Sequence, residues 1–129
     1  MCGITGMFAF NLVGKVNKIQ ITNATTALQK RGPDFQDTYI DEWVAMGHRR
    51  LSIIDTSSVA NQPMWDESKR YCIVFNGEIF NYVELRKKLQ ARGTSFFSNS
   101  DTEVLLKLFI ADKENCLSKL NGFFSFCVY

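Results

Sequence analysis

A run of apolar residues that leads into an Asn-Gly pair constrains this fold most strongly. Residues 71–75, YCIVF, are five consecutive apolar side chains, which is typical of a strand buried on both faces. Asn76 and Gly77 follow, and such a pair favours positive φ angles and sharp turns. The chain has 129 residues, of which 46% are apolar and eleven are phenylalanine, so it can form one domain with a well-filled core.

Other segments of the chain show strand-like composition or helix boundary signals. Further strands are predicted from β-branched and aromatic content at 2–10, 36–41, 43–54 and 122–129. A polar loop is predicted at 55–70, and a helix at 19–30 that ends before the RGPD sequence at 31–34.

Two more helices are predicted from their capping residues. One follows Asn81, which can cap it, and ends near Gly93. The other begins after Ser100, which forms a capping-box pattern with Glu103. Asp101 then lies in the first helical turn, where the helix dipole stabilises a carboxylate.

Composition and charge argue against several classes of function. The net charge is +2 and the basic residues are scattered, so we expect no nucleic-acid groove and no binding to an anionic membrane surface. The sequence begins without a signal-peptide pattern, and no window is long and apolar enough to span a membrane. We expect no metal site, because the chain has one histidine and its four cysteines lack C-x-x-C spacing. Cys72 and Cys127 lie within apolar runs and are predicted to be buried, which fits a reducing, cytoplasmic setting.

The second residue, Cys2, is a candidate nucleophile. If Met1 is removed, Cys2 carries both a thiol and a free α-amine, whose ordinary pKa is about 7.7–8. That amine can serve as the general base for the thiol of the same residue, directly or through one water. The alternative is that Cys2 is a small buried side chain at the start of a strand.

Six motifs in a fixed order resolve this choice through a family resemblance. They are MCGITG at 1–6, RGPD at 31–34, GHRRLSIID at 47–55, QPM at 62–64, FNGEIFNY at 75–82 and SDTEV at 100–104. Together they closely resemble the glutaminase domain of class II glutamine amidotransferases, in the variant found in glutamine-hydrolysing asparagine synthetases. The resemblance covers the whole chain. It implies an α+β N-terminal-nucleophile hydrolase fold, a four-layer αββα sandwich of two antiparallel sheets.

The resemblance also implies a reaction and a role for each site residue. The family hydrolyses the side-chain amide of glutamine to glutamate and ammonia through a thioester on the cysteine that matches Cys2. Asn76 and Gly77 match the oxyanion-hole pair. Arg50 matches the residue that grips the α-carboxylate of glutamine. Asp101 and Glu78 match the residues that hold its α-ammonium group.

Neighbouring polar residues are expected to have structural roles. Arg49 should face the opposite side of its strand from Arg50 and be solvated or structural. His48 is expected to be a structural hydrogen-bonding residue, since the α-amine of Cys2 already supplies a base. Arg31 and Asp34 are expected to shape a turn near the mouth of the pocket.

The chain is expected to be one part of a larger protein. It stops within a predicted strand at Tyr129, so residues 1–129 are interpreted as a partial glutaminase domain whose last strands are absent. No SGGxDS-like loop is found, so ATP and Mg²⁺ are expected only in an absent synthetase domain of the same polypeptide, which would receive the ammonia. Open sheet edges predict a homo-oligomer, with exchange of strands as one form. The alternative function is an inactive fragment or a glutamine-binding or assembly module, if Met1 is retained or the absent strands are needed.

Overall fold

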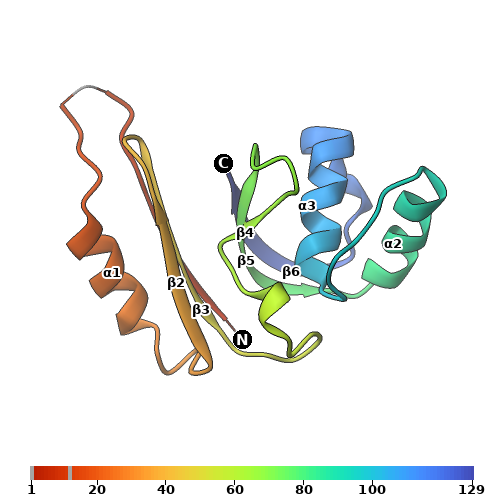
Figure 1. The fold of residues 1–129 in the computed structure, drawn as a ribbon, viewed down its shortest axis with the longest axis horizontal. Coiled ribbons are helices and arrows are strands. Elements are labelled where there is room, and N and C mark those ends of the chain that lie inside the picture. Colours follow the sequence, from red (N-terminus) through yellow and green to blue (C-terminus); the bar gives the residue numbers. More distant parts are fainter. Residues whose placement is uncertain (1, 12) are drawn as a thin grey trace.

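The computed structural model describes residues 2–11 and 13–129, so the fate of Met1 lies outside the described residues. Within these described residues the chain forms six strands, three α-helices and two 3₁₀ segments; Figure 1 shows their arrangement. In chain order these are β1 (Gly3–Phe8), α1 (Lys18–Ala27), β2 (Phe35–Ile40), β3 (Val44–Arg50), η1 (Ser58–Ala60), β4 (Met64–Trp65), β5 (Cys72–Ile79), α2 (Tyr82–Ala91), α3 (Asp101–Asp112), η2 (Lys113–Lys119) and β6 (Gly122–Val128).

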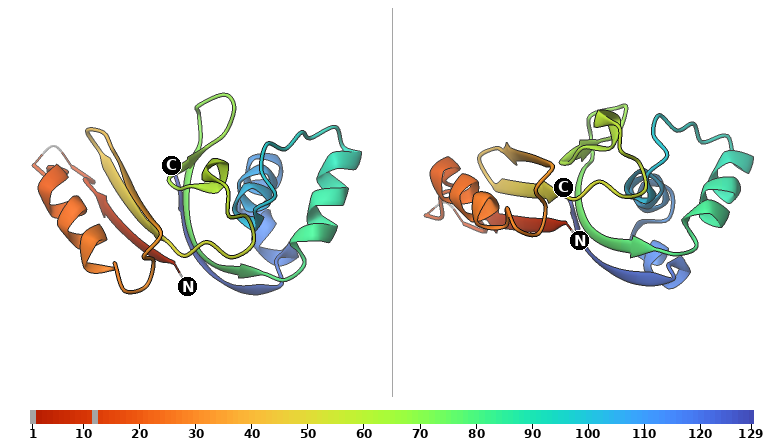
Figure 2. Two further views of the ribbon diagram at one scale, coloured as in Figure 1. Left: turned by 60° about the horizontal axis from the view of Figure 1, so that its bottom comes forward. Right: turned by 90° about the horizontal axis from the view of Figure 1, so that it is seen from below.

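The strands form two antiparallel three-stranded sheets. The first has the order β1-β3-β2, and the second has the order β4-β5-β6. Helix α1 covers the outer face of the first sheet, while α2 and α3 lie beyond the second (Figures 1 and 2). The layers therefore run helix, sheet, sheet, helix, which confirms the predicted αββα sandwich.

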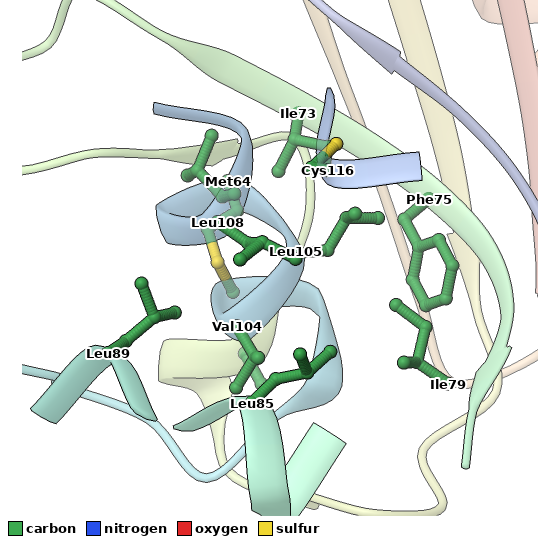
Figure 3. Close-up of a cluster of buried hydrophobic side chains, with 12 residues drawn as sticks. Met64, Ile73, Phe75, Ile79, Leu85, Leu89, Val104, Leu105, Leu108 and Cys116 are labelled. Atoms are coloured by element: carbon green, nitrogen blue, oxygen red, sulfur yellow. The ribbon is translucent and has the colours of Figure 1, made fainter. Parts of the chain in front are cut away.

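Strand β5 is the centre of the core, because its two faces are buried in different clusters. Cys72 and Val74 pack against β3 between the two sheets. Ile73 and Phe75 point to the other side, into a larger cluster with α2 and α3 (Figure 3). Alternation along the strand thus explains why residues 71–75 read as an unbroken apolar run.

The predicted turn at Asn76 and Gly77 is wrong. Strand β5 continues to Ile79, and Gly77 pairs with Phe124 of β6. Pairing with β6 from Ile73 to Ile79 keeps the backbone in strand conformation through the pair. A glycine is required here for a different reason: a Cβ atom at Gly77 would collide with the carbonyl oxygen of Phe123 and lie 2.7 Å from Cα of Phe124.

Helix termini agree with the sequence in part. Ser100 caps α3 by accepting from the N–H of Glu103 (3.1 Å), and Gly93, with φ of 88°, follows the end of α2. Asn81 does not cap α2 with its side chain. Its side chain donates to the carbonyl of Lys119 and accepts from the N–H of residue 121 instead, which ties the start of α2 to the start of β6.

Three further predictions are corrected by the structure. The strand predicted at 43–54 ends at Arg50, and the loop predicted at 55–70 contains η1 and β4. Cys72 is buried as expected, but Cys127 is exposed. Phe126 and Val128 face the core on the helix side, so alternation places Cys127 on the opposite face of β6, which is an edge strand.

Candidate active site

Five of the six predicted site residues line one pocket. They come from separate parts of the chain that meet at one end of the sandwich: Cys2 precedes β1, Arg50 ends β3, Gly77 and Glu78 lie in β5, and Asp101 begins α3. The sixth, Asn76, is not among the lining residues. The fold thus brings together a thiol, a guanidinium group and two carboxylates.

The Cys2 residue is held at both its side chain and its backbone. The N–H of Leu51, just beyond β3, lies 3.4 Å from Sγ of Cys2. The Nε–H of Arg31 donates to the carbonyl oxygen of Cys2 at 3.1 Å. The second RGPD residue predicted to shape the mouth, Asp34, accepts from the N–H of Ser52 at 2.7 Å. The RGPD turn therefore holds the segments on either side of the thiol.

Hydrogen-bond alternation in the second sheet directs the Gly77 N–H into the pocket. Cys72 and Tyr129 exchange both backbone hydrogen bonds, at 2.7 and 2.9 Å. In an antiparallel ladder such pairs alternate with pairs that exchange none. Gly77 is an odd number of residues from Cys72, so its N–H points away from β6.

The amides on either side of Gly77 along this edge already have partners. The N–H of Phe75 donates to Oε1 of Gln62 at 2.6 Å, and that of Ile79 donates to Oδ2 of Asp101 at 3.3 Å. In the part of the chain that the structure describes, no side chain accepts from the N–H of Gly77. This edge of β5 therefore offers one backbone donor to a bound molecule, in the same pocket as the Cys2 thiol.

The neighbouring Asn76 has its side chain on the face of β5 that packs against the first sheet. It shares this face with Cys72 and Val74, which pack against the first sheet. Its Oδ1 is buried and has no hydrogen-bond partner among the described residues. The role of Asn76 as a second oxyanion donor stays a prediction.

The Arg50 guanidinium is buried, with 6% of the residue exposed, and is fixed by the segment that follows β3. Its Nη1 donates to the carbonyl of Ser57 (2.7 Å) and to Oδ1 of Asn61 (2.5 Å), and its Nη2 donates to the carbonyl of Asp55. A guanidinium has five N–H donors, so two have no partner among the residues that the structure describes. Two parallel donors are what a carboxylate needs for a bidentate contact.

The preceding residue, Arg49, faces the opposite side of β3, as predicted. Its Nη1 donates to Oε1 of Gln36 at 2.9 Å, and the residue is buried. Of the two expectations for Arg49, the structural one is confirmed and the solvated one is wrong.

Two carboxylates lie across the start of α3 and the adjoining edge of β5. Asp101 is buried, and desolvation raises the pKa of its carboxyl group, with a further contribution from the charge of Glu78. Glu78 itself is exposed. A cation bound beside them would restore the favourable interaction that the Asp101 carboxylate loses on burial.

The single histidine, His48, is fully buried and bridges the two sheets. Its Nε2–H donates to the carbonyl oxygen of Phe75 at 3.2 Å. Burial lowers the pKa of the His48 imidazole to about 4, and the charge of Arg50 acts in the same direction. His48 is therefore neutral near pH 7 and does not line the pocket, so the prediction of a structural hydrogen bond is confirmed.

The sequence analysis gave no role to three polar residues of this pocket, Asp55, Gln62 and Thr102. Asp55 supplies a carbonyl to Arg50 and lines the pocket, and Gln62 joins the N–H of Phe75 to Oγ1 of Thr102. Asp55 and Gln62 lie in motifs already noted, at the end of LSIID and the start of QPM. The carboxylate of Asp55 accepts from the N–H of Asn99 and the side chain of Gln62 bonds to Thr102, 44 and 40 positions away, so neither contact leaves a local pattern.

Two structural findings concern metals and membranes. Within residues 2–11 and 13–129, no three His, Cys, Asp or Glu side chains are grouped so that they could hold a metal ion. In the same described ranges, no helix is long and apolar enough to cross a membrane.

Comparison with known proteins identifies the family. Residues 1–129 match the glutamine amidotransferase domain. The chain is similar over its full length to asparagine synthetase (glutamine-hydrolyzing) 1 of Bacillus subtilis, with 42% identity, and to the putative asparagine synthetase (glutamine-hydrolyzing) 2 of Methanocaldococcus jannaschii, with 35%. It spans 21% and 28% of the lengths of these relatives.

A solved structure is similar as well. Glutamine phosphoribosylpyrophosphate amidotransferase from B. subtilis, in complex with ADP and GMP, matches with a TM-score of 0.60 and 28% identity. The match covers 70% of this chain and 22% of that one. From the matched domain, the similar relatives and the shared fold, this chain belongs to the glutamine amidotransferase domain family.

Proposed function

We propose that this chain hydrolyses the side-chain amide of glutamine to glutamate and ammonia, with Cys2 as the nucleophile. One observation carries the proposal: the Cys2 thiol shares a pocket with the N–H of Gly77, and no side chain of the described residues accepts from that N–H. Acyl transfer needs this combination of a nucleophile and a preorganised donor for the oxyanion. The relatives named as glutamine-hydrolysing enzymes give the same substrate.

The proposed reaction proceeds in two halves. The Sγ atom of Cys2 attacks the amide carbon, and the thiol proton passes to the α-amine that Cys2 carries once Met1 is removed. The carbonyl oxygen becomes an oxyanion that accepts from the N–H of Gly77 and the side chain of Asn76. When the carbon–nitrogen bond breaks, the α-amine returns the proton to the leaving group, and ammonia departs. Water then hydrolyses the Cys2 thioester and releases glutamate.

Recognition of free glutamine is assigned to the charged groups of the pocket. The two remaining donors of Arg50 suit the α-carboxylate. Asp101 and Glu78 suit the α-ammonium group, and the bound cation would offset the desolvation that raises the pKa of Asp101. A glutamine residue within a peptide lacks both charges and would bind poorly.

The remaining expectations concern the whole protein. We propose that the ammonia passes to an ATP-dependent, asparagine-synthetase-like domain of the same polypeptide, with ATP and Mg²⁺ bound there and no cofactor in this domain. This rests on the names of two relatives, of which the chain spans 21% and 28%. A cytoplasmic setting and a homo-oligomeric state stay predictions.

Ammonia release from glutamine tests the proposed function. The wild-type protein should release ammonia, and Cys2→Ala should abolish release while still binding glutamine in calorimetry. If the wild-type protein binds glutamine and releases no ammonia, the chain is a glutamine-binding module. If neither protein binds glutamine, the assignment of the pocket is wrong.

A further inference from the structure

We propose that Asp55 is a positioning residue that fixes the separation of Arg50 from Asp101, and so sets how the pocket reads the two charged groups of an α-amino acid. This inference rests on the proposed function, since it concerns the recognition of glutamine at the same site. The evidence is that Asp55 bonds to both sides of the pocket at once.

On one side, Asp55 belongs to the segment that holds the guanidinium of Arg50. Its backbone carbonyl accepts from Nη2 of Arg50. Its carboxylate oxygen Oδ1 accepts from the N–H (2.9 Å) and the hydroxyl (2.5 Å) of Ser57, whose own carbonyl accepts from Nη1 of Arg50. Residues 55–57 and the guanidinium are therefore joined by hydrogen bonds into one unit.

On the other side, the same carboxylate reaches the segment that precedes α3. Its Oδ2 accepts from the backbone N–H of Asn99 at 2.7 Å, across 44 positions of sequence. The two residues after Asn99 are Ser100, which caps α3, and Asp101. A bond of about this length between a carboxylate and an N–H is a charge-assisted hydrogen bond.

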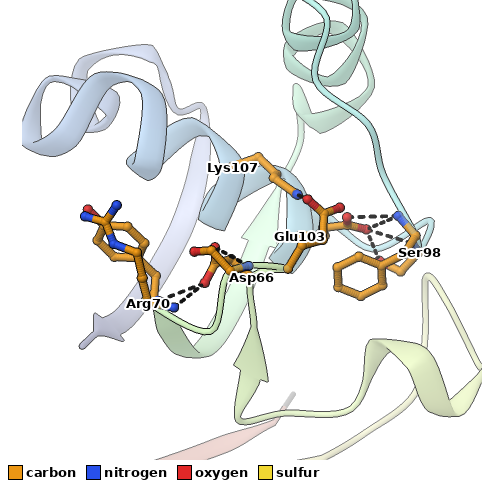
Figure 4. A network of polar contacts seen from close by, with 9 residues as sticks. Asp66, Arg70, Ser98, Glu103 and Lys107 are labelled. Carbon is orange, nitrogen blue, oxygen red and sulfur yellow. Dashed lines mark hydrogen bonds and ion pairs between the residues drawn. The ribbon is translucent and has the colours of Figure 1, made fainter.

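The segment 97–100 is itself fixed to α3. Glu103 is fully buried, and its carboxylate accepts from the N–H and the hydroxyl of Ser98, both at 2.7 Å (Figure 4). Gln62 also donates to Oγ1 of Thr102 in α3, at 3.1 Å, but it lies outside the unit formed by residues 55–57 and the guanidinium. Asp55 is therefore the residue that both accepts from the Arg50 guanidinium and bonds to the segment before α3.

This arrangement matters because glutamine carries its carboxylate and its ammonium group on one carbon atom. The substrate can satisfy Arg50 and Asp101 together only when their separation is correct. Without the hydrogen bond between Asp55 and Asn99, Arg50 can still bind a carboxylate and Asp101 can still bind an ammonium group, but one ligand cannot reach both as well. Loss of Asp55 should therefore weaken ligands that carry both charges more than ligands that carry one. The hydrogen bonds from Ser57 and Asn99 lower the pKa of Asp55, so it is ionised at working pH.

The test compares Asp55→Ala with wild type in the protein as it exists. We expect KM for glutamine to rise about tenfold or more, as for loss of a hydrogen bond to a charged group, with kcat changed much less. Glutaramate lacks the ammonium group and 4-aminobutanamide lacks the carboxylate. The inhibition constant of each analogue should change less than about threefold. Asp55→Asn should recover part of the loss, because its amide oxygen can accept from Asn99.

Asp37→Ala is the control, since it removes an equal charge from an exposed position of β2. It should leave KM unchanged. The proposal is overturned if Asp55→Ala leaves KM unchanged, or if both single-charge analogues lose affinity as strongly as glutamine does. Calorimetric binding of glutamine in a Cys2→Ala background gives the same comparison without turnover. Failure of the proposed function, in which the wild-type protein releases no ammonia, is thereby distinguished from failure of this inference.

Discussion

Protonation of His48 should make the stability of this fold depend on pH. In the folded chain, burial holds the pKa of the imidazole at about 4, whereas an exposed histidine has a pKa of about 6.5. Between these values the unfolded chain binds the proton and the folded chain does not. The stabilisation is therefore fully present above pH 6.5 and is lost as the pH falls toward 4.

The size of this effect follows from the difference between the two pKa values. A difference of about 2.5 units corresponds to about 3 kcal/mol, at about 1.4 kcal/mol per unit. This is a large share of the free energy of unfolding of a small domain, which is about 5–15 kcal/mol. Most of this stabilisation from His48 should be lost between pH 7.5 and pH 4.5, because pH 4.5 is close to the pKa of His48 in the folded state.

The assay is urea unfolding of wild type and His48→Gln at both pH values. The glutamine amide can still donate to the carbonyl of Phe75 and does not titrate, so the variant should lose about 2–3 kcal/mol less than wild type on acidification. Asp101, whose pKa is raised, acts in the opposite direction in both proteins and cancels in the comparison. Equal losses in wild type and variant would refute the reasoning.

Two further predictions concern the pocket. Gly77→Ala should reduce ammonia release about 100-fold, the effect of losing one oxyanion donor, because a Cβ atom at this position collides with β6. The control is Gly6→Ala, whose Cβ would lie 3.7 Å from the nearest backbone oxygen, and it should retain activity. Full activity of Gly77→Ala would contradict the role of the Gly77 N–H. Asp101→Asn should leave the thermal midpoint at pH 7.5 unchanged or higher, because the raised pKa means that folding disfavours the ionised carboxyl group, while glutamine binding weakens about tenfold or more. A lower midpoint for Asp101→Asn would show that the buried carboxylate stabilises the fold.

The sequence predicted the features of this fold that depend on local patterns. The apolar run of β5, the cap at Ser100 and the opposite orientation of Arg49 and Arg50 all follow from strand and helix periodicity, and all are confirmed. Motif order identified the family and five residues that line the pocket.

The features that the sequence did not predict depend on distant pairing. Asn76 and Gly77 read as a turn because nothing nearby reveals that β6 pairs with them more than 40 positions later. The exposure of Cys127 depends on its place in an edge strand, and the bond from Asp55 to Asn99 joins two loops of unrelated pattern. Such contacts are fixed by topology and are absent from composition and spacing.

Covalent labelling of Cys2 tests the central claim most directly. The intact mass of the protein would be measured before and after exposure to a diazo-ketone analogue of glutamine, with and without excess glutamine. The proposed mechanism predicts a chain without Met1 that gains one adduct, located on Cys2 and prevented by glutamine. An adduct on the exposed Cys127 instead, or no adduct on a chain that lacks Met1, would contradict the assignment of Cys2 as the nucleophile.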